Sequence, residues 1–342
     1  MNAHSSEPPK RTLRALVGGS LLAIFLIGPH RGLLIDGEAN AAEPHALGVA
    51  VAEHVVPLPG LRLVPSTETE HEQPSRAWRL VDGKHWQMIG GGTPEPTAVT
   101  DAREKNRGAC PAGMVEVKGK MKTHPTFSID GLQLQTCTKW IQKEWPERCG
   151  EYDRAKWLEQ SKDYPTKDEH FCIDRFEYPN QKDAYPIVMV TWFEARDACK
   201  AQGKRLCSEE EWTFACEGEE AMPYPTGYTR EADKCVFDEP WDMPKEGSLL
   251  PRDSDHARNE IDRIFHGAPS GSARSCKSAF GVYDMTGNID EWTRSSIPGE
   301  RPSILKGGYF GPVRTRCRPA TRAHGEGHVY YQQGFRCCAG SN

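Results

Sequence analysis

Twelve cysteines constrain this chain of 342 residues more than any other feature. Their number is even, and no Cys-x-x-Cys pair occurs among them. Zinc knuckles use closely spaced pairs, and Cys199, Cys207 and Cys216 lie too far apart to form one. Disulfides are therefore the expected state, which favours a fold cross-linked in an oxidising compartment. The residues alone leave open that some thiols are buried and free.

The first residues are typical of an export signal. Lys10, Arg11 and Arg14 precede an apolar run over 15–28, and a small-residue pattern, Ala-Asn-Ala, ends at residue 41. The apolar run is shorter than the roughly 20 residues that a membrane-spanning helix needs. We expect a signal peptide over residues 1–41 and an exported protein, whether periplasmic, cell-surface or secreted. An uncleaved anchor is the alternative, and membrane contact is expected only in that case.

The charge pattern excludes one class of partner. The formal net charge is −5, and basic and acidic residues are interspersed without a basic stripe. Nucleic-acid binding needs a concentrated cationic face, so we expect no nucleic-acid partner.

Two further regions follow the signal. Residues 42–107 are rich in proline and show weak periodicity, which predicts an irregular linker or arm with at most a strand or two. From residue 108 the sequence shows strand and helix patterns in place of the irregular, Pro-rich composition, and we expect one domain over residues 108–342.

Short strands and two capped helices are predicted in this domain. Strand patterns cover 114–117, 171–178, 187–190, 304–306 and 335–337. Thr191 with Glu194, and Ser208 with Glu211, are capping-box patterns that each predict a helix start. Residues 236–279 are polar and rich in Pro, Gly and Asp, which predicts a long excursion with little regular structure. Few helices, short strands and long loops indicate an α+β fold.

The last quarter of the chain holds the most specific motifs. It contains GVYDMTGNIDEW over 281–292, LKGGY over 305–309 and GFRCC over 334–338. Upstream, VMVTW spans 188–192, GKRL spans 203–206 and EEW spans 210–212. In this order, the set resembles the formylglycine-generating enzyme (sulfatase-modifying factor) family over roughly residues 114–339. The resemblance implies an irregular, C-type-lectin-like α+β domain held by calcium and disulfides.

The resemblance also implies two disulfides. In the family, the cysteine matching Cys199 bonds the one matching Cys337, and the cysteine matching Cys216 bonds the one matching Cys317. Cys337 and Cys338 are adjacent, so in a strand their side chains face opposite sides and need different partners. Proximity along the chain suggests two further pairs, Cys110 with Cys172 and Cys235 with Cys276.

Calcium is the cofactor that the resemblance implies. Asp284 and Glu291 would supply carboxylate oxygens, and Gly287 and Ile289 would supply backbone carbonyls. Calcium takes six to eight oxygen ligands, and this mixture of donors suits it. By spacing alone, the same residues could form an ordinary polar turn with solvated or capping carboxylates.

The copper site of the family is missing from the sequence. The generating enzymes carry two redox-active cysteines between the Gly-Gly motif and the cysteine matched here by Cys317. Here that segment reads GGYFGPVRTRC over 307–317, with no earlier cysteine. Copper(I) selects soft thiolates, which Val, Pro and Thr cannot replace. We therefore expect neither copper nor formylglycine generation by the known mechanism.

A second metal site is conceivable at His324, Glu326 and His328. Alternate positions share one face of a strand, and two histidines with a carboxylate can bind iron, zinc or another transition metal. The alternative is a Gly-rich surface loop with solvated histidines. The acidic residues 209–211 and 217–220 are interpreted as solvated helix ends.

Two functions remain open from the sequence. The first is an exported binding or structural module whose partner is an unidentified protein, peptide or glycan. The second is a metal-dependent oxidoreductase that uses the site near His324 and His328. The missing cysteine pair favours the first, and whether the protein is an enzyme stays open at this stage.

Overall fold

The computed structural model describes residues 77–81, 85–89, 109–245 and 247–341, which belong to one compact unit. The expected signal peptide and most of the expected linker lie outside the described residues. Two strands of the latter region are described, β1 (Ala77–Val81) and β2 (His85–Ile89), and they pair as an antiparallel hairpin. Trp78 exchanges two backbone hydrogen bonds with Val188, and its indole donates to the Arg252 carbonyl.

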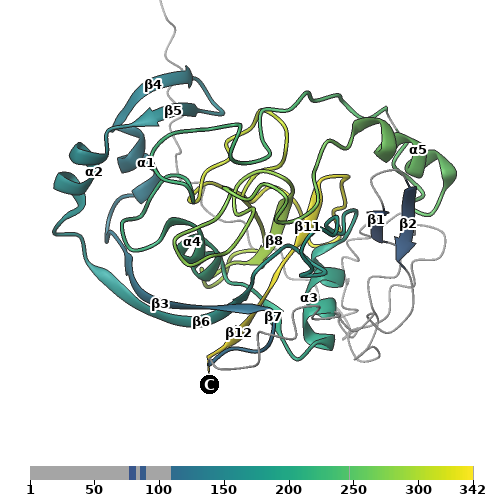
Figure 1. The fold of residues 1–342 in the computed structure, drawn as a ribbon, viewed down its shortest axis with the longest axis horizontal. Helices are drawn as coiled ribbons and strands as arrows, with labels where there is room; N and C mark the ends of the chain where they lie inside the picture. Colours follow the sequence, from purple (N-terminus) through teal and green to yellow (C-terminus); the bar gives the residue numbers. More distant parts are fainter. Residues whose placement is uncertain (1–76, 82–84, 90–108, 246, 342) are drawn as a thin grey trace, which may run out of the picture. The chain divides into compact units, whose positions relative to one another are not determined.

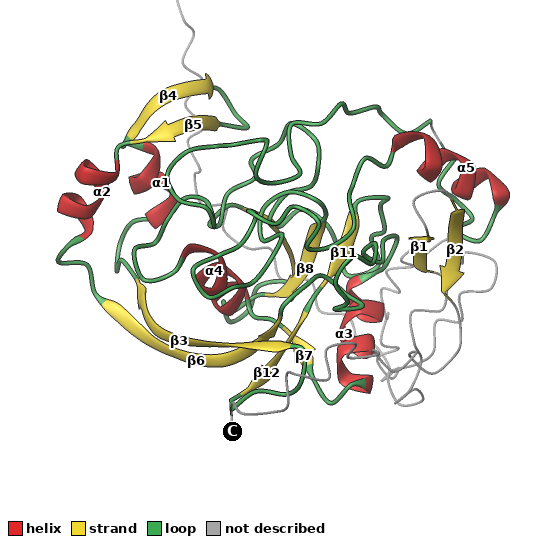
Figure 2. Cartoon of the chain, in the orientation of Figure 1, coloured by secondary structure: helices red, strands yellow, loops and turns green. Residues whose placement is uncertain are grey.

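The fold is mixed α+β with short strands and long loops, in which five helices are described (Figures 1 and 2). The helices are α1 (Ile129–Leu134), α2 (Arg154–Ser161), α3 (Trp192–Ala201), α4 (Glu209–Glu217) and α5 (Asp255–Ile264). The remaining strands are β3 (Met114–Lys122), β4 (Cys137–Gln142), β5 (Arg148–Tyr152), β6 (Thr166–Asp174), β7 (Arg205–Leu206), β8 (Asp290–Arg294), β9 (Ser303–Lys306), β10 (Ala320–Thr321), β11 (Gln333–Phe335) and β12 (Cys337–Gly340).

Two four-stranded sheets organise the domain. One has the order β3-β6-β12-β7, and the other has the order β10-β9-β8-β11. In Figure 1, β3 and β6 run side by side as a long curved pair, and their register joins Met114 to Asp174 and Lys122 to Thr166. The second sheet positions the residues of the candidate site, because β8 follows directly on the turn over 284–289.

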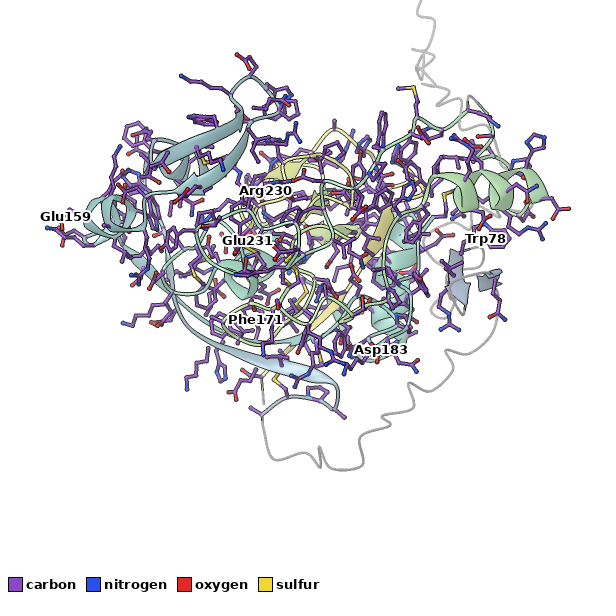
Figure 3. The ribbon with its side chains drawn as sticks, turned by 45° about the horizontal axis from the view of Figure 1, so that its top comes forward. Trp78, Glu159, Phe171, Asp183, Arg230 and Glu231 are labelled. Carbon is purple, nitrogen blue, oxygen red and sulfur yellow. A yellow bond between two sulfur atoms is a disulfide. The ribbon has the colours of Figure 1, made fainter. Side chains whose placement is uncertain are left out.

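Aromatic and aliphatic side chains fill the space beside these sheets. Phe171 of β6, which is labelled in Figure 3, packs in one cluster with Trp212 and Phe214 of α4. A second cluster joins Ala195 of α3 to Trp292 of β8. Burying large aromatic side chains is the main source of stability in such cores, at about 25 cal/mol per Å² of apolar area.

Both predicted helix starts have the expected cap geometry. Thr191 caps α3 and Ser208 caps α4, and each side chain accepts from the backbone N–H of the glutamate three residues on. The glutamate side chains, Glu194 and Glu211, accept in return from the cap backbone, which completes both capping boxes.

The structure corrects several of the sequence predictions. Residues 187–190 are buried but do not form a strand, because Met189 has a φ of +62° that breaks the extended backbone. The strand predicted over 171–178 ends at Asp174. The segment over 236–279, for which the sequence predicts little regular structure, contains helix α5. Besides the two expected main helices, α3 and α4, the described residues form three others, α1, α2 and α5. Glu217 is not solvated: its side chain is fully buried.

Candidate functional site

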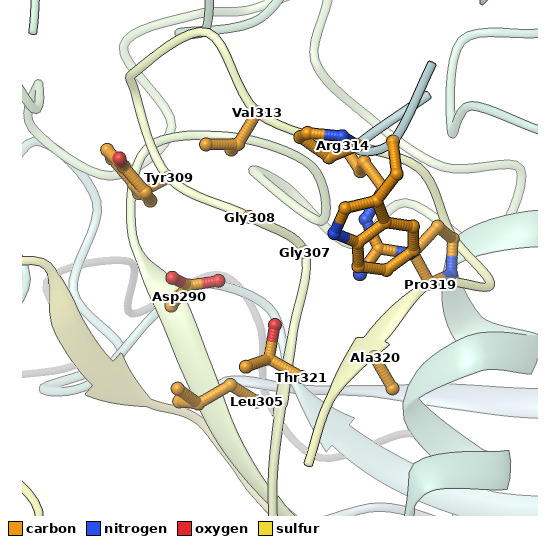
Figure 4. A pocket seen from close by; sticks show the side chains of 12 residues that line it. Asp290, Leu305, Gly307, Gly308, Tyr309, Val313, Arg314, Pro319, Ala320 and Thr321 are labelled. Atoms are coloured by element: carbon orange, nitrogen blue, oxygen red, sulfur yellow. The ribbon is translucent and has the colours of Figure 1, made fainter. Parts of the chain in front are cut away.

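A cavity of about 200 Å³ opens next to the Gly307-Gly308 segment. It is lined by residues of the segment before Cys317, which is where members of the resembled family carry their redox-active cysteine pair. Its walls come from β8, the end of β9, the loop over 307–319, β10 and the turn between β4 and β5 (Figure 4). The lining residues are Trp145, Pro146, Asp290, Leu305, Gly307, Gly308, Tyr309, Val313, Arg314, Pro319, Ala320 and Thr321.

The two glycines let the backbone pass close to its neighbours. Gly307 and Gly308 have φ values of +91° and +71°, in the region that only glycine adopts readily. A Cβ atom at Gly308 would lie 2.7 Å from the Cγ2 atom of Thr315, so a side chain here would push the loop outward. The glycine pair therefore shapes one wall of the cavity.

Asp290 contributes the acidic group of the cavity. It is the first residue of β8, and its half-buried carboxylate accepts a hydrogen bond from the Gly308 backbone N–H. Burial raises the pKa of Asp290 to about 7, although the Gly308 bond opposes the shift. Asp290 is not among the residues expected from the sequence, because only its neighbours at positions 289 and 291 belong to the calcium motif that the resemblance implies.

Arg314 contributes the basic group. Its guanidinium carbon lies 3.8 Å from the centre of the Trp145 ring, which is a cation–π contact. Trp145 is itself 69% exposed, so it forms an aromatic surface at the mouth of the cavity. In Figure 4, Asp290 and Arg314 lie on either side of Gly308.

Sulfur does not contribute to this cavity. All twelve cysteines lie in the described residues, and the structure joins them in six disulfides with no free thiol. Cys199 is joined to Cys337, and Cys216 to Cys317, which are the two pairs that the resemblance implies. The other pairs are Cys110 with Cys172, Cys137 with Cys149, Cys207 with Cys338 and Cys235 with Cys276.

The expected calcium ligands lie in a tight, buried turn. Asp284 and Gly287 both have positive φ values, +56° and +83°. A Cβ atom at Gly287 would lie only 2.2 Å from the Val236 carbonyl oxygen, so this position accepts no side chain. The side chains of Asp284, Ile289 and Glu291 are all buried, which rules out solvated carboxylates at this turn.

The two expected carboxylate ligands already have hydrogen-bond partners. Glu291 receives two bonds from Arg336, at 2.7 and 2.6 Å, and one from the Trp212 indole at 2.9 Å. Asp284 accepts from the Gly271 backbone N–H at 2.6 Å, and burial raises its pKa to about 7. Each carboxylate keeps lone pairs that could face a cation.

Glu177 is a third buried carboxylate in this cluster, and the sequence reasoning missed it. Its Oε2 atom accepts from the Ser270 hydroxyl at 2.6 Å and from the Asn288 amide at 2.8 Å. Its Oε1 atom is buried without a partner. Burial and the charges of Asp284 and Glu291 raise the pKa of Glu177 well above its usual range. No local sequence signal marks this residue, because its acidic neighbours lie more than 100 positions away.

The residues proposed for a second metal are only partly brought together. His324 and His328 stack with their ring centres 4.0 Å apart, and burial lowers the pKa of both imidazoles. The Oε1 atom of Glu326 instead lies 2.9 Å from the Ser303 hydroxyl and 3.7 Å from Arg301. Across the described part of the chain, no group of three or more His, Cys, Asp or Glu side chains is arranged to hold a metal ion.

None of the helices among the described residues is both long and apolar enough to cross a bilayer.

Comparison with known proteins gives a family match over most of the described region. Residues 123–340 match the family model of the sulfatase-modifying factor enzyme 1-like domain. A bovine protein named inactive C-alpha-formylglycine-generating enzyme 2 is 30% identical over 170 residues, which cover 47% of this chain and 52% of that protein. Its mouse counterpart is 29% identical over 168 residues, which cover 46% and 50% of the two chains. The chain thus spans about half the length of these relatives.

A solved structure described as CarF is also similar. It has a TM-score of 0.41 and 15% sequence identity, and the match covers 68% of this chain and 99% of that one.

Proposed function

The chain belongs to the family of sulfatase-modifying factor enzyme 1-like domains, and from that premise we propose that it is an exported binding module that does not generate formylglycine. The observation that carries this proposal is the state of the cysteines. All twelve are committed to disulfides, and the cavity beside Gly308 is lined without sulfur. A copper(I) centre of the thiolate type has no ligands there.

The named relatives support the same direction. Two of them carry the word inactive in their names. A fold whose loops vary on a rigid, cross-linked frame is well suited to recognition, because the frame holds the loops in place. The partner is a protein, a peptide or a glycan.

Incubation with a cysteine-containing peptide and copper tests the loss of the parent activity. Mass spectrometry is expected to show unchanged peptide, while an active formylglycine-generating enzyme converts the same peptide in parallel. Aldehyde product that depends on this chain would overturn the proposal. Retention of a ligand from a peptide or glycan array, lost after thermal denaturation, is the positive result expected for a binding module.

Export is the second part of the proposal. Six disulfides are typical of proteins that mature in an oxidising compartment. Mass analysis of the mature protein is expected to show an N-terminus just after Ala41 and all cysteines oxidised. Recovery of the full-length chain from a membrane fraction would instead favour an uncleaved anchor.

Calcium at the turn over 284–291 is the third part. Glu177, Asp284 and Glu291 are all buried and act on one guanidinium, that of Arg336, so ionisation of all three carboxyls would leave an excess of negative charge. Buried charge is costly unless it is balanced, and a divalent cation would balance it. The oxygen donors present fit a hard cation such as calcium. The ion would stabilise the turn and supply no step of catalysis.

The alternative, a metal-dependent oxidoreductase, has weaker support. His324 and His328 lie together, but the Glu326 carboxylate is turned toward Ser303 and Arg301. Stoichiometric iron or copper in the purified protein, lost in a His324→Ala, His328→Ala double variant, would favour this alternative over the binding module.

A further inference from the structure

We propose that the cavity beside Gly308 binds a small ligand through a carboxylate group, with Arg314 as its anchor and Asp290 as the acceptor for a hydrogen-bond donor of the same ligand. This inference rests on the proposed binding role and specifies its chemistry.

The guanidinium of Arg314 is positioned in the cavity wall and is available to bind an anion. No described residue accepts a hydrogen bond from its guanidinium, although the side chain is half-buried in the cavity wall. The guanidinium carbon lies 3.8 Å from the centre of the Trp145 ring, and this contact reduces the conformational freedom that binding would otherwise remove. A planar guanidinium presents parallel N–H groups that match the two oxygens of a carboxylate.

Asp290 restricts which anions the cavity accepts. Its carboxylate lines the same small space, and the Gly308 N–H supplies a single hydrogen bond. A doubly charged phosphate would meet stronger repulsion from this residue than a singly charged carboxylate would. A ligand that carries a hydrogen-bond donor or an ammonium beside its carboxylate would satisfy both side chains at once.

The size and walls of the cavity favour a small ligand. A volume of about 200 Å³ is below the range of pockets that hold drug-sized molecules. Apolar side chains line the rest of it, among them Leu305, Val313, Pro319 and Ala320. The chemistry therefore fits a small α-amino acid, or the C-terminal residue of a peptide, whose last amide N–H would face Asp290.

Calorimetric titration of the full mature protein tests the proposal with four probes. These are N-acetyl-glycyl-alanine, its C-terminal amide, free alanine and inorganic phosphate. We expect the free carboxylate to bind and amidation to weaken binding by at least about tenfold, because the charge-assisted pair is lost. Preference for the acetylated dipeptide identifies a peptide terminus as the source, and preference for alanine identifies a free amino acid.

Variants locate the binding site. Arg314→Met and Asp290→Ala are each expected to weaken the probe that binds by about tenfold or more, and Arg314→Lys by less, because lysine keeps the charge without the planar fork. Arg196→Met is the matched control, since Arg196 also stacks on an aromatic ring but at an exposed site on α3. Melting curves check that each variant is folded.

Three results would overturn the proposal: equal binding of the amide, equal or tighter binding of phosphate, or binding that survives Arg314→Met. If no carboxylate binds while an array still yields a ligand, the carboxylate inference fails and the binding role stands. If the array also yields nothing, both fail.

Discussion

Glu217 and Arg318 form a two-pronged ion pair in which the carboxylate is fully buried. The Nε atom of Arg318 lies 2.6 Å from one carboxylate oxygen, and an Nη atom also donates to the Lys122 carbonyl. The pair joins α4 to the segment after Cys317, one residue away from the disulfide between Cys216 and Cys317. Charge and sulfur therefore link the same two segments.

Removing Arg318 should be far more costly than removing a surface arginine. Arg318→Met leaves Glu217 charged and buried without a partner, so we expect the free energy of unfolding to fall by about 3–5 kcal/mol. Arg322→Met, which breaks exposed pairs with Glu209 and Glu300, should cost less than about 1 kcal/mol. Urea denaturation compares the two, and equal losses would contradict the role given to Glu217.

The disulfides should differ in their contribution to stability. Cys199 and Cys337 are 138 residues apart, whereas Cys137 and Cys149 are 12 apart. In the chain-entropy model, the longer loop contributes about 2 kcal/mol more. We expect a Cys199→Ala, Cys337→Ala variant to lose that much more than a Cys137→Ala, Cys149→Ala variant in non-reducing urea titrations. A larger loss for the short loop would show that the entropy of the unfolded chain does not dominate.

Gly287 should tolerate no side chain. Gly287→Ala forces a positive φ on alanine and puts its Cβ against the Val236 carbonyl, so we expect a loss of about 3 kcal/mol. Gly203→Ala is the control: its φ is +70°, but no atom lies within 4 Å, and about 1 kcal/mol is expected. Both are measured with a calcium chelator present, so that ion binding does not enter the comparison. Equal losses would mean that the turn relaxes away from Val236.

Stability at acid pH should depend on Glu260. Its hydrogen bond from Arg263 lowers the pKa of Glu260 to about 2, below the unfolded value near 4.5. The stabilisation is therefore fully present above about pH 4.5 and is lost as the pH falls toward 2. Glu260→Gln should lower the free energy of unfolding by about 1–2 kcal/mol at pH 7. In denaturation curves, it should also reduce the loss of stability between about pH 4.5 and pH 2, which we call the acid limb. The exposed Glu159, labelled in Figure 3, gives the control variant Glu159→Gln, which should leave the limb unchanged.

Calcium should raise the melting temperature if the turn over 284–291 binds it. At a concentration one hundred times the dissociation constant, the expected gain is about 2.7 kcal/mol. Asp284→Asn should remove the response. Asp183→Asn is a matched control, because Asp183 also has a positive φ but is exposed. No shift with calcium in the unaltered protein, or a full shift in Asp284→Asn, would contradict the assignment.

Local signals predicted the helices that begin with capping boxes. Thr191 and Ser208 each precede a glutamate at the right spacing, and cap hydrogen bonds form within a few residues whatever the rest of the chain does. Helix α5 carried a weaker signal of the same kind. Ser254 caps it, and Ala257, Ile261 and Ile264 recur with helical spacing, but the polar surroundings concealed this pattern.

Tertiary contacts account for what the sequence could not show. The apolar run over 187–190 predicts a strand, but only Val188 forms a β-bridge, and its partner is Trp78, far upstream. The cavity combines residues 145, 290 and 314, which no spacing rule connects. The sequence around Glu217 predicts a solvated helix end, because its partner, Arg318, lies 101 residues away.

The neighbouring cysteines of β12 have a consequence for biosynthesis. Cys337 and Cys338 bond to Cys199 and Cys207, two segments made more than 100 residues earlier. Until the C-terminal strand has been made, those earlier thiols have no correct partner and are open to mispairing. Both correct bonds can form only after residue 338 has been made, which makes the yield of folded protein depend on the timing of thiol oxidation.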